Sequence, residues 1–176
     1  MTAFREDFDS LVPQNTYNRR GFITMAENRQ KLLEREGARS SLVFGDLDDL
    51  KHVNDTLGHG EGDRALQEIA QVFRECFRAS DIIARIGGDE FCALLTYASE
   101  SNEAAIRERL ACILEAHNSR PKRLYRLSLS LGIARIRVPY GIEVELARAD
   151  AQMYDHKRRK RLHPGGGHTV PALSAL

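Results

Sequence analysis

The sequence has no tryptophan, only three cysteines and five prolines among its 176 residues, and no long apolar run. The cysteine count is odd and no C-x-x-C pair occurs, which argues against a disulfide framework or a structural zinc site and favours a reducing compartment. We expect Cys76, Cys92 and Cys112 to be buried as small apolar side chains. No segment approaches the roughly 20 apolar residues of a membrane span, and the N-terminus lacks a secretory signal. We therefore expect a cytoplasmic protein.

Neither sign of charge is in excess, because 26 lysines and arginines face 25 aspartates and glutamates, for a formal net charge of +1. No overall field favours nucleic acid or a membrane, so any anion must be recognised by local groups. The length suits a single soluble domain. We divide the chain into a lead-in at residues 1–17, a domain at 18–162 and a tail at 163–176. Three successive glycines in the tail predict disorder.

Apolar periodicity predicts four helices and four strands. The helices are expected at residues 19–36, 63–77, 102–117 and 142–160, and the strands at 40–46, 81–86, 90–96 and 125–136. A polar, glycine-rich connection is expected at 48–62. From the first strand onward the order is β-α-β-β-α-β, with one helix added before it and one after. This order favours a ferredoxin-like α/β sandwich, an α+β plan shared with polymerase palm domains, in which helices cover a central sheet.

Three acids are candidates for a site. Asp46 ends the first expected strand, while Asp89 and Glu90 follow two glycines at the tip of an expected hairpin. If these strands are neighbours, the carboxylates converge, and converging carboxylates repel one another unless a cation lies between them. Magnesium suits such oxygen ligands. Ordinary turn acids are the alternative, but Gly87 and Gly88 tolerate the positive φ of a tight turn and let the backbone approach a ligand, which favours a site.

Four motifs share one order along the chain. Residues 46–63 read DLDDLKHVNDTLGHGEGD, 85–91 read RIGGDEF, 130–132 read SLG and 150–157 read DAQMYDHK. Together they resemble the GGDEF family of diguanylate cyclases from about residue 18 to residue 161. The resemblance implies an enzyme that condenses two GTP molecules into cyclic di-GMP and releases pyrophosphate. Since each chain holds one GTP, it also implies a two-fold homodimer.

The resemblance also implies roles for the acids. It assigns a Mg²⁺ or Mn²⁺ site to the carboxylates of Asp46, Asp89 and Glu90 and to the backbone carbonyl of Leu47. Asp89 is further implied as the catalytic base that receives the ribose 3′-hydroxyl proton, and Glu90 as its catalytic partner at the metal. The two glycines of the turn are implied to lie against the nucleotide phosphates.

Further residues match substrate and inhibitor positions of the family. Guanine recognition is implied for Asn54 and Asp63, another substrate contact for His59, and triphosphate contacts for Lys51, Lys157 and Arg161. For residues 157–161 a solvated basic helix end is the alternative, and we expect Lys157 to face phosphate while most of its basic neighbours are solvated. Arg78 and Asp81 have the R-x-x-D form of the site at which cyclic di-GMP inhibits the family, although the two side chains could simply pair.

Departures from the family pattern occur in three places. Residues 9–17 match the usual D-P-L-T-G-L poorly, Leu50 replaces a frequent phenylalanine, and Lys160 and Leu162 flank Arg161 where glycine and asparagine are usual. One alternative is a catalytically inactive member that binds GTP or cyclic di-GMP as a regulator. Another is an adenylyl or guanylyl cyclase on the same plan, although Asn54 and Asp63 favour guanine. Family members usually carry an upstream sensory domain, which we expect in a longer protein.

Overall fold

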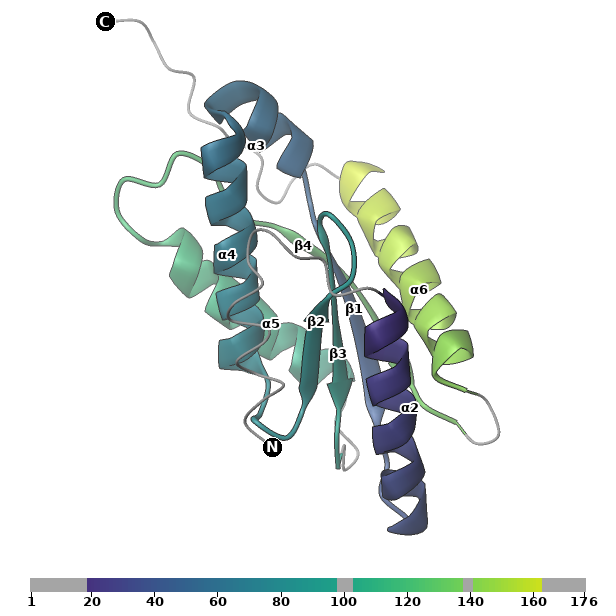
Figure 1. The fold of residues 1–176 in the computed structure, drawn as a ribbon. Coiled ribbons are helices and arrows are strands. Elements are labelled where there is room, and N and C mark those ends of the chain that lie inside the picture. Colours follow the sequence, from purple (N-terminus) through teal and green to yellow (C-terminus); the bar gives the residue numbers. More distant parts are fainter. Residues whose placement is uncertain (1–18, 98–102, 138–140, 163–176) are drawn as a thin grey trace, which may run out of the picture.

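The computed structural model describes residues 19–97, 103–137 and 141–162, so the expected lead-in and tail lie outside the described residues (Figure 1). The helices and strands follow the order that the sequence predicts, with one additional helix, α3. The helices are α2 (Arg19–Arg35), α3 (Leu50–Leu57), α4 (His59–Cys76), α5 (Glu103–Asn118) and α6 (Ile142–Leu162). The strands are β1 (Ser41–Leu47), β2 (Ile82–Arg85), β3 (Glu90–Leu95) and β4 (Leu129–Arg135).

The four strands form one sheet in the order β2-β3-β1-β4, and every neighbouring pair is antiparallel. The first strand thus lies in the middle, between the second strand of the hairpin and the last strand of the chain. This arrangement confirms the predicted ferredoxin-like α/β plan. It also places the end of β1 beside the tip of the β2–β3 hairpin.

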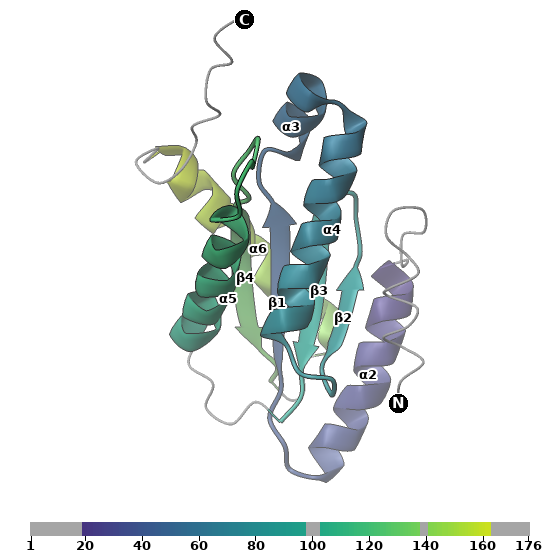
Figure 2. The same ribbon diagram turned by 90° about the vertical axis from the view of Figure 1, so that its left-hand side faces the viewer.

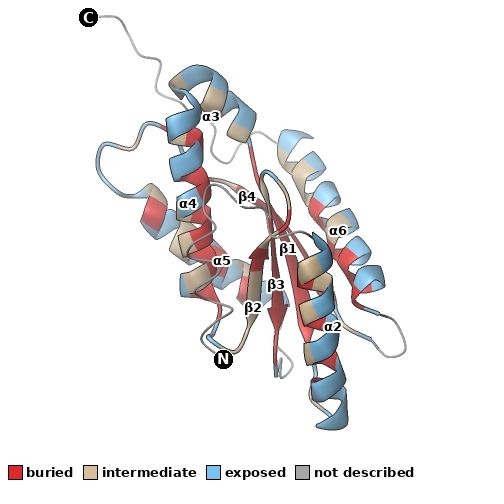
Figure 3. Cartoon of the chain, in the orientation of Figure 1, coloured by how far each residue is buried: buried red, intermediate tan, exposed pale blue. Residues whose placement is uncertain are grey.

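Helices cover both faces of the sheet, with α4 and α5 on one side and α2 and α6 on the other (Figures 1 and 2). Successive β1 side chains point to opposite faces, so Val43 packs with the α4 and α5 core while Leu42 and Phe44 pack with the α2 and α6 core. Because helices cover both faces, every residue of β1 is buried, including the polar residues Ser41 and Asp46. The buried residues follow the strands and the inward stripes of the helices (Figure 3).

The prediction of a polar connection without helices at 48–62 is wrong, because α3 and the start of α4 lie in this segment. Leu50, Val53 and Leu57 have helical spacing, but the glycines that follow obscure the pattern. Gly58 forms the joint between the two helices with φ 89°, and its N–H donates to the carbonyl of Asn54 at the end of α3. A residue without a side chain adopts this backbone conformation without strain.

The long strand predicted at 125–136 is also shorter in the structure, where only Leu129–Arg135 pairs with β1. The Asn118 side chain binds both backbone groups of Leu127, accepting from its N–H at 2.8 Å and donating to its carbonyl at 2.9 Å. These groups are therefore satisfied without a neighbouring strand. Leu127 itself stays buried, which is why its apolar alternation resembles a strand.

Two smaller expectations need correction. Cys76 and Cys92 are buried, but Cys112 is exposed on α5. The β2–β3 hairpin forms as predicted, yet among the described glycines only Gly37 and Gly58 have positive φ. Its turn is closed instead by the Ile86 N–H donating to the Glu90 carbonyl at 2.9 Å. No helix in the described ranges is long and apolar enough to cross a membrane.

Candidate functional site

The end of β1 and the tip of the β2–β3 hairpin are joined by backbone pairing. Asp46 lies opposite Glu90 in the β1–β3 register, and the Leu47 N–H donates to the Asp89 carbonyl at 2.9 Å. The four residues assigned to metal therefore share one end of the sheet, although their roles stay predictions. Gly87 packs closely against the Glu90 side chain at this end, where a Cβ would overlap the carboxylate.

Burial and mutual repulsion shape the charge of this acidic end. Burial raises the pKa of Asp46, and Asp89 and Asp48 add to the rise, against the opposing hydrogen bond from Lys157. Burial likewise raises the pKa of Glu90, with Asp89 among the neighbouring acids that add to it. A nearby cation would relieve this repulsion. The donors are all oxygens, which fits a hard ion such as Mg²⁺.

The acidic side chains at this end do not form a closed metal-binding cluster. In the part of the chain that the structure describes, no three His, Cys, Asp or Glu side chains meet closely enough to hold an ion. The oxygen donors come instead from two segments brought together by the sheet. Since magnesium keeps several water and phosphate ligands and needs only one or two carboxylates, the residues present still fit it.

The basic end of α6 approaches the same acids. The Lys157 ammonium lies 2.5 Å from Asp46 Oδ1, whereas Arg158 and Arg159 are exposed as expected. Arg161 is also exposed, and its phosphate contact stays a prediction. Lys160 departs from that expectation. Its ammonium donates to Asp48 Oδ2 at 2.8 Å, and sequence reasoning missed this pair because the two residues are 112 positions apart.

The two predicted guanine-binding residues lie at the α3–α4 corner. The Asn54 carboxamide packs over Gly62, where a Cβ would overlap its Oδ1, and Asp63 follows as an exposed residue of α4. Asp63 and Asp89 both act electrostatically on Arg85, whose pKa is lowered by burial. Lys51 in the first turn of α3 and His59 at the start of α4 are exposed.

Arg85 contacts the glycine turn, although sequence reasoning did not single it out. Its guanidinium donates to the carbonyl of Gly88 at 2.6 Å and to that of Gly87 at 3.2 Å. The side chain therefore holds the two glycine carbonyls of the turn. Its position directly before the turn motif was the available signal.

The predicted inhibitory pair has a structural contact of its own. One carboxylate oxygen of Asp81 accepts the backbone N–H of Arg78 at 2.8 Å, and the other accepts the N–H of Thr96 at 2.9 Å. Asp81 thus joins the start of β2 to the end of β3, while the Arg78 side chain is exposed. The contact between the two residues runs through backbone rather than through two paired side chains.

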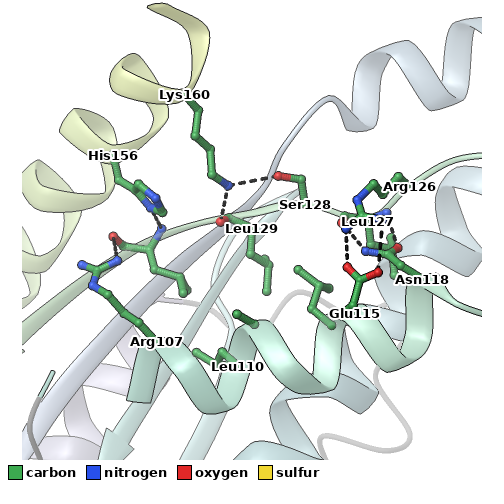
Figure 4. Close-up of a pocket in the computed structure, with 13 residues that line it drawn as sticks. Arg107, Leu110, Glu115, Asn118, Arg126, Leu127, Ser128, Leu129, His156 and Lys160 are labelled. Atoms are coloured by element: carbon green, nitrogen blue, oxygen red, sulfur yellow. Dashed lines mark hydrogen bonds and ion pairs between the residues drawn. The ribbon is translucent and has the colours of Figure 1, made fainter. Parts of the chain in front are cut away.

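A cavity of about 380 Å³ lies elsewhere, between α5, β4 and the end of α6 (Figure 4). Leucines form much of its lining, and Arg107, Arg126, His156 and Lys160 contribute polar groups. The His156 Nδ1 accepts the Leu131 N–H at 3.0 Å, and burial lowers the pKa of this histidine. None of the residues that line the cavity is a predicted site residue, so the acidic sheet end remains the better candidate on chemical grounds.

The fold and this acidic end define a ferredoxin-like α/β domain with Asp46, Asp89 and Glu90 at one end of its sheet. The family model described as "Diguanylate cyclase, GGDEF domain" matches residues 13–163. The chain therefore belongs to the GGDEF family. It is 35% identical over 174 residues to the diguanylate cyclase DosC of Escherichia coli K12, covering 92% of this chain but 37% of DosC.

Other relatives agree with this assignment. The bifunctional diguanylate cyclase/cyclic di-GMP phosphodiesterase MucR of Pseudomonas aeruginosa is 38% identical over 128 residues, or 72% of this chain and 19% of MucR. The GGDEF domain of DgcB from Caulobacter crescentus, solved with cyclic di-GMP, has a TM-score of 0.71 and 27% identity, covering 82% of this chain and 85% of that chain. The GGDEF domain of TpbB (YfiN) from P. aeruginosa has a TM-score of 0.72 and 31% identity, covering 82% and 86%.

Proposed function

We propose that this chain is a metal-dependent diguanylate cyclase domain that condenses two GTP molecules into cyclic di-GMP. The observation that carries the proposal is the meeting of β1 with the glycine turn, where Asp46 lies opposite Glu90 and Leu47 binds the Asp89 backbone. The family match supports the same chemistry. Each 3′-hydroxyl attacks the α-phosphate of the opposite GTP, forms one phosphodiester bond and expels pyrophosphate.

The carboxylates of Asp46, Asp89 and Glu90 and the Leu47 carbonyl would hold Mg²⁺ or Mn²⁺. A bound divalent ion neutralises phosphoryl charge and favours the ionised hydroxyl. Asp89 receives the proton from the 3′-hydroxyl as general base. Lys157 is a phosphate contact in this proposal, and its place beside Asp46 supports that role because it lies close to the oxygens that would hold the ion.

Guanine is read at the α3–α4 corner in this proposal. The Asp63 carboxylate accepts from N1–H and the exocyclic amine of guanine, while Asn54 completes the contact. Adenine has a lone pair at N1, which would face the carboxylate without a hydrogen bond, and such mismatches are costly in a desolvated site. The packing of Asn54 on Gly62 supports a fixed position for its carboxamide.

The product and partners follow from the reaction. Because cyclic di-GMP contains two identical halves, two chains must face each other as a homodimer. We further propose that cyclic di-GMP inhibits by binding Arg78 and Asp81. A longer protein with a sensory domain is proposed because the chain spans only 37% of DosC.

Incubation of the purified chain with GTP and Mg²⁺, followed by chromatography and mass spectrometry, tests the function. Cyclic di-GMP and pyrophosphate are expected, and Asp89→Asn should lower their formation at least about a hundredfold. Asp155→Asn is the matched control, because it removes an exposed acid of α6 outside the site. Tight GTP binding without turnover would instead identify a regulator, and a cyclic mononucleotide would identify a different cyclase.

A further inference from the structure

Lys160 is held at three points although it lies in the last turn of a surface helix. Its ammonium donates to Asp48 Oδ2 at 2.8 Å, to the Leu129 carbonyl at 2.6 Å and to Ser128 Oγ at 3.0 Å. The latter two contacts are drawn in Figure 4. An ammonium has three N–H donors, so this side chain is fully used.

Asp48 forms the other half of the network and is buried, with an exposed side-chain fraction of 7%. It accepts hydrogen bonds from Ser128 Oγ and Ser130 Oγ, both at 2.7 Å. A buried carboxylate needs a cation and hydrogen bonds to offset its lost hydration. Removal of Lys160 would leave this charge supported by the two hydroxyl groups.

Two successive lysine–aspartate pairs join α6 to the end of β1 and the residue after it. Lys157 binds Asp46, and Lys160 binds Asp48. Residues three apart, such as Lys157 and Lys160, lie on one side of a helix. Asp46 lies in β1, and Asp48 follows directly after the strand, where its N–H donates to the Ser128 carbonyl at 2.9 Å. The second pair therefore fixes both the rotation of α6 and its position along β1, which determines where the Lys157 ammonium lies.

We propose that Lys160 is a positioning residue that acts through Lys157 on the GTP triphosphate. The proposal rests on the proposed function, because the triphosphate is the assigned partner of Lys157. The resemblance does not supply this role, since glycine is usual at the position of Lys160. The residue thus gives this chain a fixed helix end where the family pattern has no side chain.

Hydrogen–deuterium exchange of the nucleotide-free chain tests the anchoring step. Lys160→Met keeps the apolar stem and the helix propensity but loses the charge, and Lys160→Gln retains a donor. Amides of residues 154–162 should exchange about tenfold faster in Lys160→Met than in wild type. Arg158→Met, which removes an exposed charge from the same turn, should leave exchange unchanged. Equal exchange in wild type and Lys160→Met would overturn the anchoring step.

Equilibrium binding tests the link to Lys157. The probe is the GTP analogue with a methylene group between the α- and β-phosphorus atoms, measured calorimetrically with Mg²⁺. We expect Lys160→Met to raise its Kd about tenfold, and to have little further effect in a Lys157→Met background, because both changes remove the same contact. The same tenfold loss in both backgrounds, or no loss in either, would refute action through Lys157.

The two readouts separate this inference from the proposed cyclase. A wild-type chain that binds the analogue but yields no cyclic di-GMP from GTP contradicts the cyclase and leaves the binding test of Lys160 intact. A wild-type chain that does not bind the analogue contradicts both the cyclase and the role of Lys160 toward nucleotide. Thermal unfolding of both Lys160 variants shows whether the domain is folded in each case.

Discussion

Two aspartates separated by a single residue have pKa values shifted in opposite directions. Burial and neighbouring acids raise the pKa of Asp46. Burial alone would also raise the pKa of Asp48, but the Lys160 ammonium and the hydroxyl groups of Ser130 and Ser128 lower it. The environment therefore favours the ionised form of Asp48, whereas at Asp46 burial and the neighbouring acids outweigh the hydrogen bond from Lys157. This difference suits the proposed metal role of Asp46.

The lowered pKa of Asp48 predicts acid sensitivity. A depressed carboxyl pKa contributes stability that is present above the ordinary value of 3.8 and lost as the pH falls through the folded value. Asp48→Asn should cost about 3 kcal/mol near neutral pH, since it breaks a buried pair. It should also flatten the decline of stability between about pH 5 and pH 2. Urea unfolding across this range measures both effects, and Asp155→Asn should retain the wild-type slope.

Asp63 determines base selectivity if the corner between α3 and α4 reads guanine. Inosine triphosphate lacks the exocyclic amine, so wild type should prefer GTP over it by about tenfold or more in kcat/KM. Asp63→Ala should lose most of this preference without unfolding, because the side chain is exposed. Asp55→Ala, an exposed acid on α3, is the control. An unchanged preference in Asp63→Ala would contradict the assignment.

At the scale of elements, the connection from α4 through β2 to β3 depends on one carboxylate. Asp81→Ala leaves the N–H groups of Arg78 and Thr96 without their acceptor, so it should cost about 2 kcal/mol of unfolding free energy. Arg78→Ala should change stability by less than about 0.5 kcal/mol yet weaken cyclic di-GMP inhibition. Denaturation and inhibition assays on both variants separate the two roles, and Arg78→Ala with unchanged inhibition would argue against the site.

The contact between α6 and β4 depends on Gly132. A Cβ at this position would overlap the Ala149 carbonyl and come within 2.7 Å of the Met153 nitrogen, and backbone atoms cannot move aside easily. Gly132→Ala should therefore cost about 3 kcal/mol, as measured by thermal or urea unfolding. Gly60→Ala on α4 has no neighbouring atom within 4 Å and should be neutral or stabilising. Equal stability of the two variants would refute the close approach.

Local patterns predicted most elements, and contacts distant in sequence account for the rest. The first helix, the hairpin and the last helix have clear periodicity, and their bounds agree with the structure within about two residues. The helix α3 was missed because it is short and the glycines that follow it obscure its pattern. The absence of a side chain at position 62 is explained by the Asn54 side chain that packs over Gly62. No local sequence pattern indicates this contact.

The candidate site divides in the same way. The sequence indicates Asp46, Asp89 and Glu90 because each of these acids lies beside the end of a short apolar run. Asp48 and Lys160 do not, since their pairing depends on how α6 lies along β1. Side chains that fix the position of a site residue are thus harder to find from sequence than the site residue itself.

At the scale of the whole molecule, the proposed reaction requires two chains, since each phosphodiester bond joins nucleotides held by different copies. The proposed nucleotide side of the domain is open, because Lys51, His59, Asp63 and Gly88 are exposed. An open face allows a second chain to approach with its own GTP. The curated relatives are longer proteins, and this chain covers 37% of DosC.

The concentration dependence of turnover tests this requirement. Below the dissociation constant of the dimer, the rate should rise with about the square of the enzyme concentration, because dimers form in proportion to that square. Specific activity then levels off once most chains are paired. At that plateau, an excess of Asp89→Asn chains should suppress the activity of wild-type chains by capturing them in mixed pairs, whereas Asp155→Asn chains should add activity. Turnover that stays first order in enzyme and resists the Asp89→Asn excess would show that one chain completes the reaction, which the symmetry of the product argues against.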